Sequence, residues 1–448
     1  MKFVTFTATA IALAMAAGSV YAKVSAAEVA KLGTTLTAMG AEKAGNAAGT
    51  IPAYTGGLAM DRNGDPYANP ELVAETALFV IDSTNIDKYK ASLSDGQIAM
   101  FKKYPDTFKM PVYKTHRTAG YPDRIKAKAK ANALSAELIQ GGNGLVNFDE
   151  TAPFVIPKSG VEAIWNHVTR FRGGASEQNY ALIPVQNGGN YTAEIVRSSF
   201  SPPQYLQGGA DAKEDNNILF YYTAATRSPA RLTGNVLLVH ETIDQVKEPR
   251  KAWQYNAGQR RVRRAPQVAY DAPNTEGMRT SDQVDMYNGS PDRYNWKLVG
   301  KKEMYIPYNA YKLGDRNAKY ADIIGENHIN PEFTRYELHR VWHVEATLKE
   351  GARHIYSKRE LYLDEDSWQV AIADHYDSRG NLWRVAEGHA LQYINLGGMW
   401  YSGNTNYDLS SGRYMAQLFN EEENPIRIID DAKRTDFSTA ALRRSGKR

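Results

Sequence analysis

The spacing of apolar residues changes near the middle of the chain. After Asn179 the period becomes two, and short runs of Tyr, Val, Ile and Thr alternate with turn clusters. Before about residue 175, apolar positions recur at helical intervals in four segments: 25–40, 70–81, 93–104 and 122–139. The sequence therefore predicts an α+β fold, with a helical part at about 23–175 and a β-rich part at about 176–420.

The clearest strands lie between residues 335 and 394. Short turns separate four alternating runs: 336–348, 354–363, 368–377 and 382–394. Parallel pairing needs a crossover of a dozen or more residues, so these runs predict an antiparallel meander. Large sheets hide their edges by curling or by covering them with helices. We therefore expect one domain, a strongly curved antiparallel sheet with the N-terminal helices on its concave face, followed by a charged, loosely held tail from Glu421.

The first residues have the three parts of a secretory signal. Lys2 precedes an apolar run at 3–17, and Val20-Tyr21-Ala22 supplies small residues for cleavage after Ala22. We expect a signal peptide at 1–22 and a mature chain at 23–448 in the periplasm of a Gram-negative cell. No later stretch reaches the roughly 20 apolar residues of a spanning helix, which predicts no transmembrane segment after cleavage.

Composition removes several classes of function. The chain has no cysteine, which excludes disulfides, a Cys nucleophile and lipoprotein acylation. Its 54 basic and 50 acidic residues are nearly balanced, and this argues against nucleic acid as a partner. The 28 Tyr and 7 Trp suit half-buried sheet positions, where an apolar ring and a polar tip are both useful.

The candidate catalytic and metal-binding residues are few. His339 and His343 lie four residues apart, and on a strand this spacing separates them by roughly 13 Å, too far to share one ion. The triplet 364–366, Asp-Glu-Asp, lies at an expected hairpin turn, where we interpret it as turn chemistry. No nucleophile or phosphate-binding motif occurs. We therefore expect no metal, no cofactor and no enzymatic activity, with a hydrolase that lacks recognisable motifs as a remaining alternative.

The segment 251–266 is the most distinctive in the chain. Trp253 and Tyr255 alternate before a turn at Gly258, and four arginines then surround Val262: Arg260, Arg261, Arg263 and Arg264. This pattern predicts a hairpin. Its arginines suit an anionic lipid head group or an acidic partner, because guanidinium forms charge-assisted hydrogen bonds with both. A solvated face whose arginine stems cover apolar surface is an equally good interpretation.

Two segments, LGTTLTAMGAEKAGNAAGTIPAYTGGL at 32–58 and VYKTHRTAGYP at 112–122, resemble a family of uncharacterised, outer-membrane lipoprotein-sorting-like proteins of Gram-negative bacteria. The resemblance runs along nearly the whole mature chain. The Trp-Gln-Tyr at 253–255 with the following RRVRRAP resembles a strand motif of LolA, LolB and LppX-like periplasmic carriers, and the hairpin 376–384 resembles their later strands. Tyr54 stands where relatives often have Trp, and Ala47-Ala48-Gly49 replaces a more acidic triplet, which puts a role for that loop's aromatic in doubt.

The resemblance implies a half-open β-barrel whose helices plug the concave face and which binds a lipid or other hydrophobic molecule. It also implies an RND-type inner-membrane permease and an outer-membrane protein as partners. We expect a carrier or adaptor in envelope transport, with a ligand-free scaffold of such a complex as the alternative. The candidate aromatic wall is Trp253, Tyr255, Trp342, Trp368 and Trp383. Each of these is equally well interpreted as an ordinary core residue.

Overall fold

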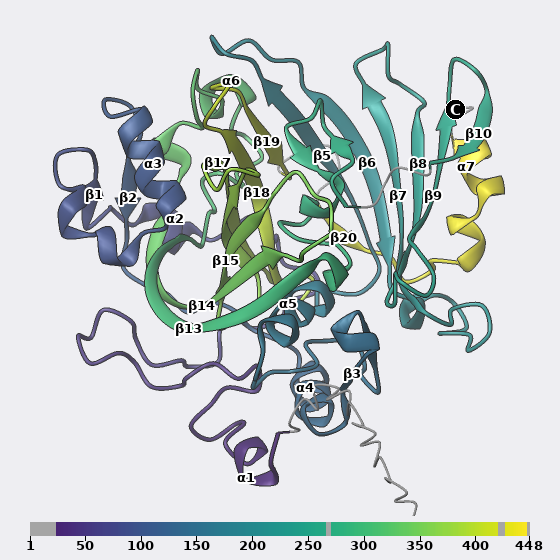
Figure 1. Ribbon diagram of the computed structural model, residues 1–448, viewed down its shortest axis with the longest axis horizontal. Coiled ribbons are helices and arrows are strands. Elements are labelled where there is room, and N and C mark those ends of the chain that lie inside the picture. Colours follow the sequence, from purple (N-terminus) through teal and green to yellow (C-terminus); the bar gives the residue numbers. More distant parts are fainter. Residues whose placement is uncertain (1–23, 266–269, 420–425, 446–448) are drawn as a thin grey trace, which may run out of the picture.

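The computed structural model describes residues 24–265, 270–419 and 426–445, and Figure 1 shows their arrangement. The predicted signal peptide lies outside these residues. The helices are α1 Ala26–Val29, α2 Pro70–Ala74, α3 Asp95–Lys103, α4 Asp123–Ser135, α5 Gly160–Thr169, α6 Tyr320–Ile323 and α7 Thr439–Ser445. No described helix has the length and apolar character needed to cross a membrane.

Most strands belong to one large sheet. The strands are β1 Phe79–Ile81, β2 Met110–Val112, β3 Glu137–Ile139, β4 Gly144–Val146, β5 Ser176–Val185, β6 Glu194–Ser201, β7 Ile218–Ser228, β8 Val236–Thr242, β9 Lys251–Asn256, β10 Arg261–Arg264, β11 Pro273–Asn274, β12 Arg279–Thr280, β13 Tyr294–Pro307, β14 Tyr336–Leu348, β15 Lys358–Asp364, β16 Val370–Tyr376, β17 Leu382–Tyr393, β18 Gly398–Asp408, β19 Tyr414–Leu418 and β20 Arg427–Ile428. The sheet holds 16 of them, in the order β1-β2-β14-β15-β16-β17-β18-β19-β5-β6-β7-β8-β9-β10, with β13 beside β14 and β20 beside β5.

The predicted meander is confirmed. Strands β14 to β19 follow one another in both sequence and space, and each pairs antiparallel with the next. The sheet then continues from β19 to β5, where Leu418 lies opposite Ala181, although these residues are far apart in the sequence. Among the strands of the described residues, only β2 and β14 pair in parallel. In the described part of the chain the sheet is mostly antiparallel and is not closed into a barrel.

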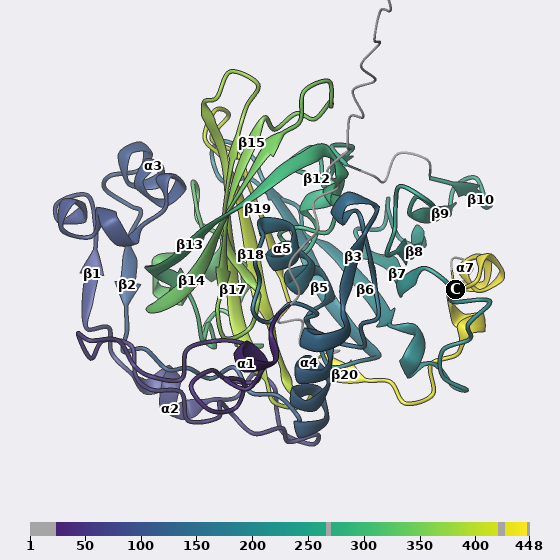
Figure 2. The ribbon, with the colours of Figure 1, turned by 60° about the horizontal axis from the view of Figure 1, so that its bottom comes forward.

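Helices cover both faces of this sheet. Helix α5 packs against β13 and β14 on one face, here called the α5 face, together with Val344, Leu361 and Tyr180. Helix α3 packs against β16 and β17 on the other, here called the α3 face, which also carries Ile183 and Val385. In Figure 2, α5 and α4 lie in front of the sheet and α3 lies to one side. Every residue of β16 is buried because both faces are covered there.

The predicted helices were only partly right. The segment 93–104 contains α3, whose Ser94 caps the helix in a reciprocal pair with Gln97, and 122–139 contains α4. The prediction for 25–40 is wrong after Val29, because Gly33 and Gly40 take φ of +88° and +86° and turn the chain. In 70–81 the helix ends at Ala74, and β1 follows at Phe79–Ile81.

Two further expectations need correction. Helix α5 was not among the predicted segments, although its polar residues Glu162, Asn166 and Thr169 recur at helical spacing; all ten residues of the helix, these three included, are buried. The prediction of a loosely held tail is wrong for 426–445. Phe437 and Leu442 are buried against Tyr221, Leu238 and Tyr255. In Figure 1, α7 lies beside β9 and β10.

Candidate functional site

A cavity of about 330 Å³ lies on the α5 face of β5–β8, here called the β5–β8 cavity. Alternate residues of these strands line it, because successive side chains of a strand point to opposite faces. Its apolar lining combines aromatic and aliphatic side chains: Tyr180, Leu182, Val196, Phe200, Phe220, Tyr222, Ala224, Val236, Leu237, Val239, Trp400, Tyr401 and Phe419. The mixture of wide rings and alkyl groups suits an apolar ligand.

The remaining wall comes from residues 271–290, here called the closing segment. It contributes Asn274, Arg279, Ser281, Val284, Asp285 and Asn288 to the lining. Its strands β11 and β12 form a small hairpin in which Asn274 lies opposite Arg279. The turn between them needs positive φ at Thr275, Glu276 and Gly277, and the Gly277 carbonyl accepts a hydrogen bond of 2.8 Å from Arg384.

Buried ion pairs fix the closing segment to the rest of the protein. Asp282 accepts a hydrogen bond of 2.7 Å from Arg359 of β15. Asp285 binds Arg170, which follows α5, at 2.6 Å and accepts a hydrogen bond from Trp400 Nε1 at 3.1 Å. Burial raises the pKa of Asp285, but the charges of Arg170 and Arg172 act more strongly, so its pKa lies below the ordinary value. The segment is therefore a fixed wall of the cavity.

The charged groups that line the cavity differ in their partners. Arg250 pairs with Glu241 at 2.7 Å, and Arg172 pairs with Asp285. Glu194 accepts a hydrogen bond of 2.8 Å from the hydroxyl of Thr226. Arg279 donates to two neutral amides, Asn274 Oδ1 at 3.0 Å and Gln417 Oε1 at 2.8 Å. The cavity thus contains a guanidinium group that no carboxylate neutralises among the described residues.

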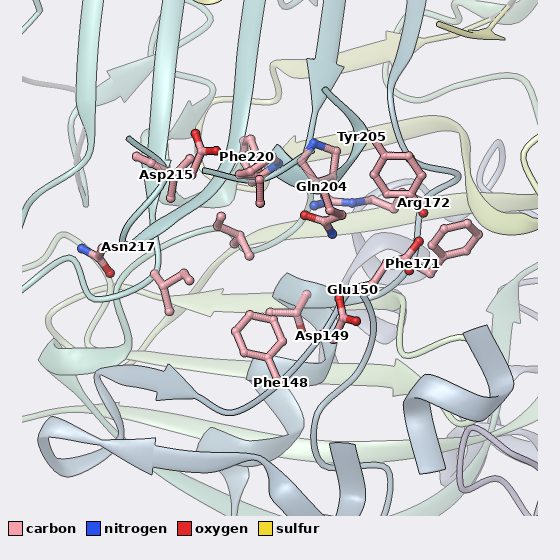
Figure 3. A pocket seen from close by; sticks show the side chains of 18 of the residues that line it. Phe148, Asp149, Glu150, Phe171, Arg172, Gln204, Tyr205, Asp215, Asn217 and Phe220 are labelled. Carbon is pink, nitrogen blue, oxygen red and sulfur yellow. The ribbon is translucent and has the colours of Figure 1, made fainter. Parts of the chain in front are cut away.

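A second cavity, of about 500 Å³, adjoins the first. The two share Arg172, Phe200 and Phe220 in their linings, and the Arg172 guanidinium lies 4.9 Å from the ring centroid of Phe200. Figure 3 shows Phe220 and Gln204 on one side of this second cavity, with Phe148 and Glu150 across from them. Arg172 therefore lies at the boundary between the two cavities.

A third hollow, of about 850 Å³, lies near the N-terminal strands. Its walls come mainly from loops, with basic side chains such as Lys109 and Arg316 and the exposed apolar residues Val73 and Val80. It does not lie over the strands that carry the β5–β8 cavity. We therefore take the two adjoining cavities as the candidate ligand site.

The five predicted aromatic residues do not form one wall. Trp253 packs edge to face on His240, and Tyr255 is buried beside Phe437, so both lie on the α3 face of β8 and β9. The residue between them, Gln254, lines the cavity on the other face. No member of the predicted set belongs to the described residues that line the β5–β8 cavity.

The other three predicted aromatic residues lie among β14–β18. Trp342 and Trp368 stack with their ring centroids 6.1 Å apart, and Trp368 donates from Nε1 to the carbonyl of Met39 at 2.9 Å. Trp383 lies apart from them and donates to Asp408 at 3.0 Å. Of these three, Trp342 and Trp368 lie together near α5, where Trp368 is buried in the core and half-buried Trp342 packs against it.

The predicted arginine hairpin is present at the edge of the sheet. Strand β10 pairs with β9 so that Arg263 lies opposite Gln254 and Arg264 lies opposite Trp253. Arg260, Arg261, Arg263 and Arg264 are all exposed, whereas Val262 is half-buried. Arg261 and Arg263 share the face of Gln254, next to the cavity, because alternate residues of a strand share a face.

The acidic triplet takes part in more than a local turn, which corrects our interpretation. Arg117 binds Asp366 with two hydrogen bonds, of 2.8 and 2.7 Å, and Lys301 binds Glu365 at 2.8 Å. Asp364 and Asp366 lie within 4.8 Å of His339, and burial raises the pKa of Asp364 to about 7. Since Arg117 occupies both oxygens of Asp366, we interpret this cluster as a buried ion-pair network. His343 belongs to a separate cross-strand pair with Glu360.

Sequence analysis did not identify the closing segment as part of the site. It also did not identify Trp400 and Phe419, two aromatic residues from the C-terminal end of the meander. One available signal was the capping pattern of Thr280 with Gln283, which marks an ordered turn rather than a free loop. Another was the alternation of Tyr180 with Leu182 on β5 and of Phe220 with Tyr222 on β7, the two strands that flank β6. Neither signal identifies which face a ligand would use.

Comparison with known proteins agrees with the predicted resemblance. An uncharacterised protein of Pseudomonas aeruginosa, PA3922, is 54% identical over 449 residues, covering 98% of this chain and 97% of the relative. Among solved structures, a DUF1329 family protein from Desulfovibrio piger matches 60% of this chain and 92% of its own, at 14% identity and a TM-score of 0.42. The LolA superfamily protein NE2245 from Nitrosomonas europaea matches 61% and 94%, at 12% identity and a TM-score of 0.38. The model of the family "Protein of unknown function (DUF1329)" matches residues 80–443, and the chain belongs to this family.

Proposed function

We propose that this protein is a periplasmic carrier or adaptor that holds a lipid or other hydrophobic molecule in the β5–β8 cavity. The observation that carries the proposal is the cavity itself, about 330 Å³ of space beside a second one of about 500 Å³. Small-molecule sites typically enclose about 300–1,000 Å³ and are mostly apolar with a few polar groups. The protein acts in this proposal by binding, without chemistry.

The lining supports a ligand with an alkyl or ring portion. Phe220, Tyr222 and Leu237 come from neighbouring strands and offer apolar surface on one side. Trp400 and Phe419 offer it from the meander, and their rings lie 5.5 Å apart. Each CH₂ group buried between such walls stabilises the complex by about 0.8 kcal/mol. A chain of moderate length would therefore supply useful affinity without any specific polar contact.

The proposal also includes the shape and location of the protein. The sheet would form a half-open barrel with α5 on its concave side and the cavity beneath its open half. Residues 1–22 would direct export, and the carrier would pass its cargo between an RND-type inner-membrane permease and an outer-membrane protein. Arg260, Arg261, Arg263 and Arg264 would contact a lipid head group or an acidic partner, since they are exposed on the edge strand β10.

The experiment compares two alanines that are adjacent on β7. Ala224 and Ala225 are both half-buried, but Ala224 lines the cavity and Ala225 packs against the α3 face. Ala224→Phe should fill the cavity and reduce binding of a fluorescent fatty acid at least about tenfold, the equivalent of 1.4 kcal/mol. Ala225→Phe should leave binding within about twofold, although it costs a similar amount of stability from overpacking.

Native mass spectrometry of the chain from Lys23, purified from periplasm, identifies the cargo class. A stoichiometric lipid or hydrophobic metabolite on the wild type, absent from Ala224→Phe, is the expected result. A wild-type chain that carries no such molecule and binds no hydrophobic probe would contradict the carrier proposal and favour the scaffold. Equal loss of probe in both alanine variants would place the binding site elsewhere.

A further inference from the structure

We propose that the β5–β8 cavity selects single-chain anionic amphiphiles and that Arg279 binds their carboxylate or phosphate group. This inference rests on the proposed function, because it names the chemistry of the ligand at the same site. The guanidinium of Arg279 would receive the anionic group, and the aromatic and aliphatic lining would receive the tail. A ligand without a charged group would leave the presence of Arg279 in this lining unexplained.

The surroundings of Arg279 are unusual for a buried charge. The side chain belongs to a residue that is only 4% exposed, yet both of its hydrogen-bond acceptors are amide oxygens, from Asn274 and Gln417. None of the described carboxylates lies within the 4.0 Å of an ion pair with it. An isolated buried charge is costly, so buried guanidinium groups are normally paired with an anion.

The neighbouring arginines follow that rule. Arg250, which lines the same cavity, binds Glu241, and the fully buried Arg359 binds Asp282 at 2.7 Å. Arg384, which holds the turn of the Arg279 hairpin, binds Asp408 at 3.1 Å. Arg279 therefore differs from its neighbours in lacking a carboxylate while still facing the cavity. An anionic ligand would supply the missing partner.

A second, independent group in the same cavity lacks a partner. Gln178 of β5 is 5% exposed, and its side-chain oxygen has no hydrogen-bond donor within the described part of the chain. Buried polar groups almost always have a partner, so an unpaired amide marks a place where a ligand or ordered water completes the bonding. The unpaired atom is an acceptor, so a hydroxyl group of the ligand or an ordered water would donate to it, while the amide nitrogen of the same side chain would donate to a carboxylate or phosphate oxygen.

The size of the space limits the rest of the ligand. About 330 Å³ is at the small end of ligand sites, and it favours one acyl chain over two. The adjoining cavity of about 500 Å³ begins at Phe200 and Phe220, which extends the apolar route away from the first cavity. The guanidinium of Arg172 at that boundary shares one carboxylate, Asp285, with Arg170, so it has a carboxylate contact that Arg279 lacks.

The test compares ligands that share a tail and differ in charge. The probes are a fluorescent polyene fatty acid and its uncharged methyl ester, titrated into the mature chain at neutral pH. We expect the acid to bind about tenfold or more tightly than the ester, because a hydrogen bond to a charged group is the stronger one. Displacement by an unlabelled fatty acid or by a lysophosphatidic acid of equal chain length then distinguishes a carboxylate from a phosphate source.

Two variants locate the preference at Arg279. Arg279→Gln should remove the acid's advantage and leave ester binding within about twofold. Gln417→Glu keeps the arginine, supplies it with an internal carboxylate partner and should abolish the same advantage, which guards against simple misfolding of the first variant. Glu194→Gln removes a negative charge from the same lining and should maintain or increase the preference for the acid.

The outcomes separate the two proposals. If the wild type binds neither probe, the carrier proposal fails. If it binds acid and ester equally, or if the acid's advantage survives in both Arg279→Gln and Gln417→Glu, the carrier proposal stands and the role of Arg279 is overturned. Loss of the advantage in both variants with ester binding retained supports Arg279 as the anion-binding group.

Discussion

The strands β14–β19 and the strands β5–β8 belong to one sheet, but their α5 faces are covered in different ways. Over β14–β19, helix α5 and the N-terminal segments pack directly on the sheet, and every residue of β15, apart from half-buried Lys358, and all of β16 and β19 is buried. Over β5–β8, the closing segment stands off the sheet and leaves the cavity. Alternating aromatic and apolar residues are therefore compatible with both a sealed core and a ligand space.

The two regions also differ in the partners of their buried arginines. Among β14–β19 buried arginines such as Arg359 and Arg384 each have a carboxylate, and burial lowers the pKa of His389 to about 3, so that it stays neutral. Beside the cavity, the described residues that bind the side chain of Arg279 are neutral amides. The comparison indicates that these buried arginines of the first region have carboxylate partners, whereas Arg279 beside the cavity has none among the described residues.

The largest difference in the free energy of unfolding is expected between two arginine substitutions, one in each region. Arg359→Met leaves Asp282 buried without its main partner and should lower the free energy of unfolding by about 3–5 kcal/mol. Arg279→Met leaves no carboxylate unpaired and should change it by less than about 1 kcal/mol. Urea unfolding followed by tryptophan fluorescence measures both. Similar losses in the two variants would remove the distinction between the regions.

The next largest difference in the free energy of unfolding is expected between two leucine substitutions, one in each region. Leu361 of β15 is fully buried, and Leu361→Ala should cost about 2–5 kcal/mol because it creates a new cavity in packed surroundings. Leu237 of β8 faces an existing cavity and is half-buried, so Leu237→Ala should cost only about 1 kcal/mol. The same unfolding measurement applies. A larger loss at Leu237 than at Leu361 would show that the β5–β8 cavity is closed in solution.

The smallest expected effect is a dependence of the free energy of unfolding on pH, which comes from the buried carboxyl group of Asp374. Burial raises its pKa to about 7, so the folded state binds this proton more tightly than the unfolded chain does. The free energy of unfolding contributed by Asp374 is therefore present at low pH and is lost as pH rises through about 7. Asp374→Asn should gain stability relative to the wild type between pH 5 and pH 8, by at least about 1.4 kcal/mol, the equivalent of one pKa unit.

The half-buried carboxylate of Asp377 serves as a control, because its pKa is shifted in the opposite direction. Hydrogen bonds from Asn381 and Arg379 lower the pKa of Asp377, so its contribution to stability is present above the unfolded pKa and is lost as the pH falls. Asp377→Asn should therefore lose stability relative to the wild type as the pH rises from 3 to 6. Thermal unfolding across this pH series records both variants. A flat difference for Asp374→Asn would place its ionisation outside this range.

The strands were largely predictable because their pattern is local. The run 336–348 coincides with β14, and the other three runs of the meander overlap β15, β16 and β17. The run at 354–363 began too early, since His354 lies before β15 and bonds to Asp282 of the closing segment instead of joining the sheet. That contact joins residues far apart in the sequence, which no local period reveals.

The candidate site was less predictable because its location depends on what covers each face. On β9 the sequence offers Trp253 and Tyr255 on one face and Gln254 on the other, and the aromatic pair is the natural choice for an apolar ligand. In the structure the C-terminal segment covers the aromatic pair through Phe437 and Leu442. The face of Gln254 is the one left open to the cavity. Which face receives a covering helix cannot be obtained from the strand's own residues.

The pairing of β5 with β19 has a consequence for the order in which the protein assembles. During synthesis, β5–β10 emerge early, but β5 finds its partner β19 only after the whole meander has been made. The closing segment likewise waits for Arg359 and Trp400 before its ion pairs and hydrogen bonds can form. Contacts between distant residues slow folding. The cavity is consequently one of the last parts of the molecule to be enclosed, and a growing chain exposes its apolar lining until the final strands arrive.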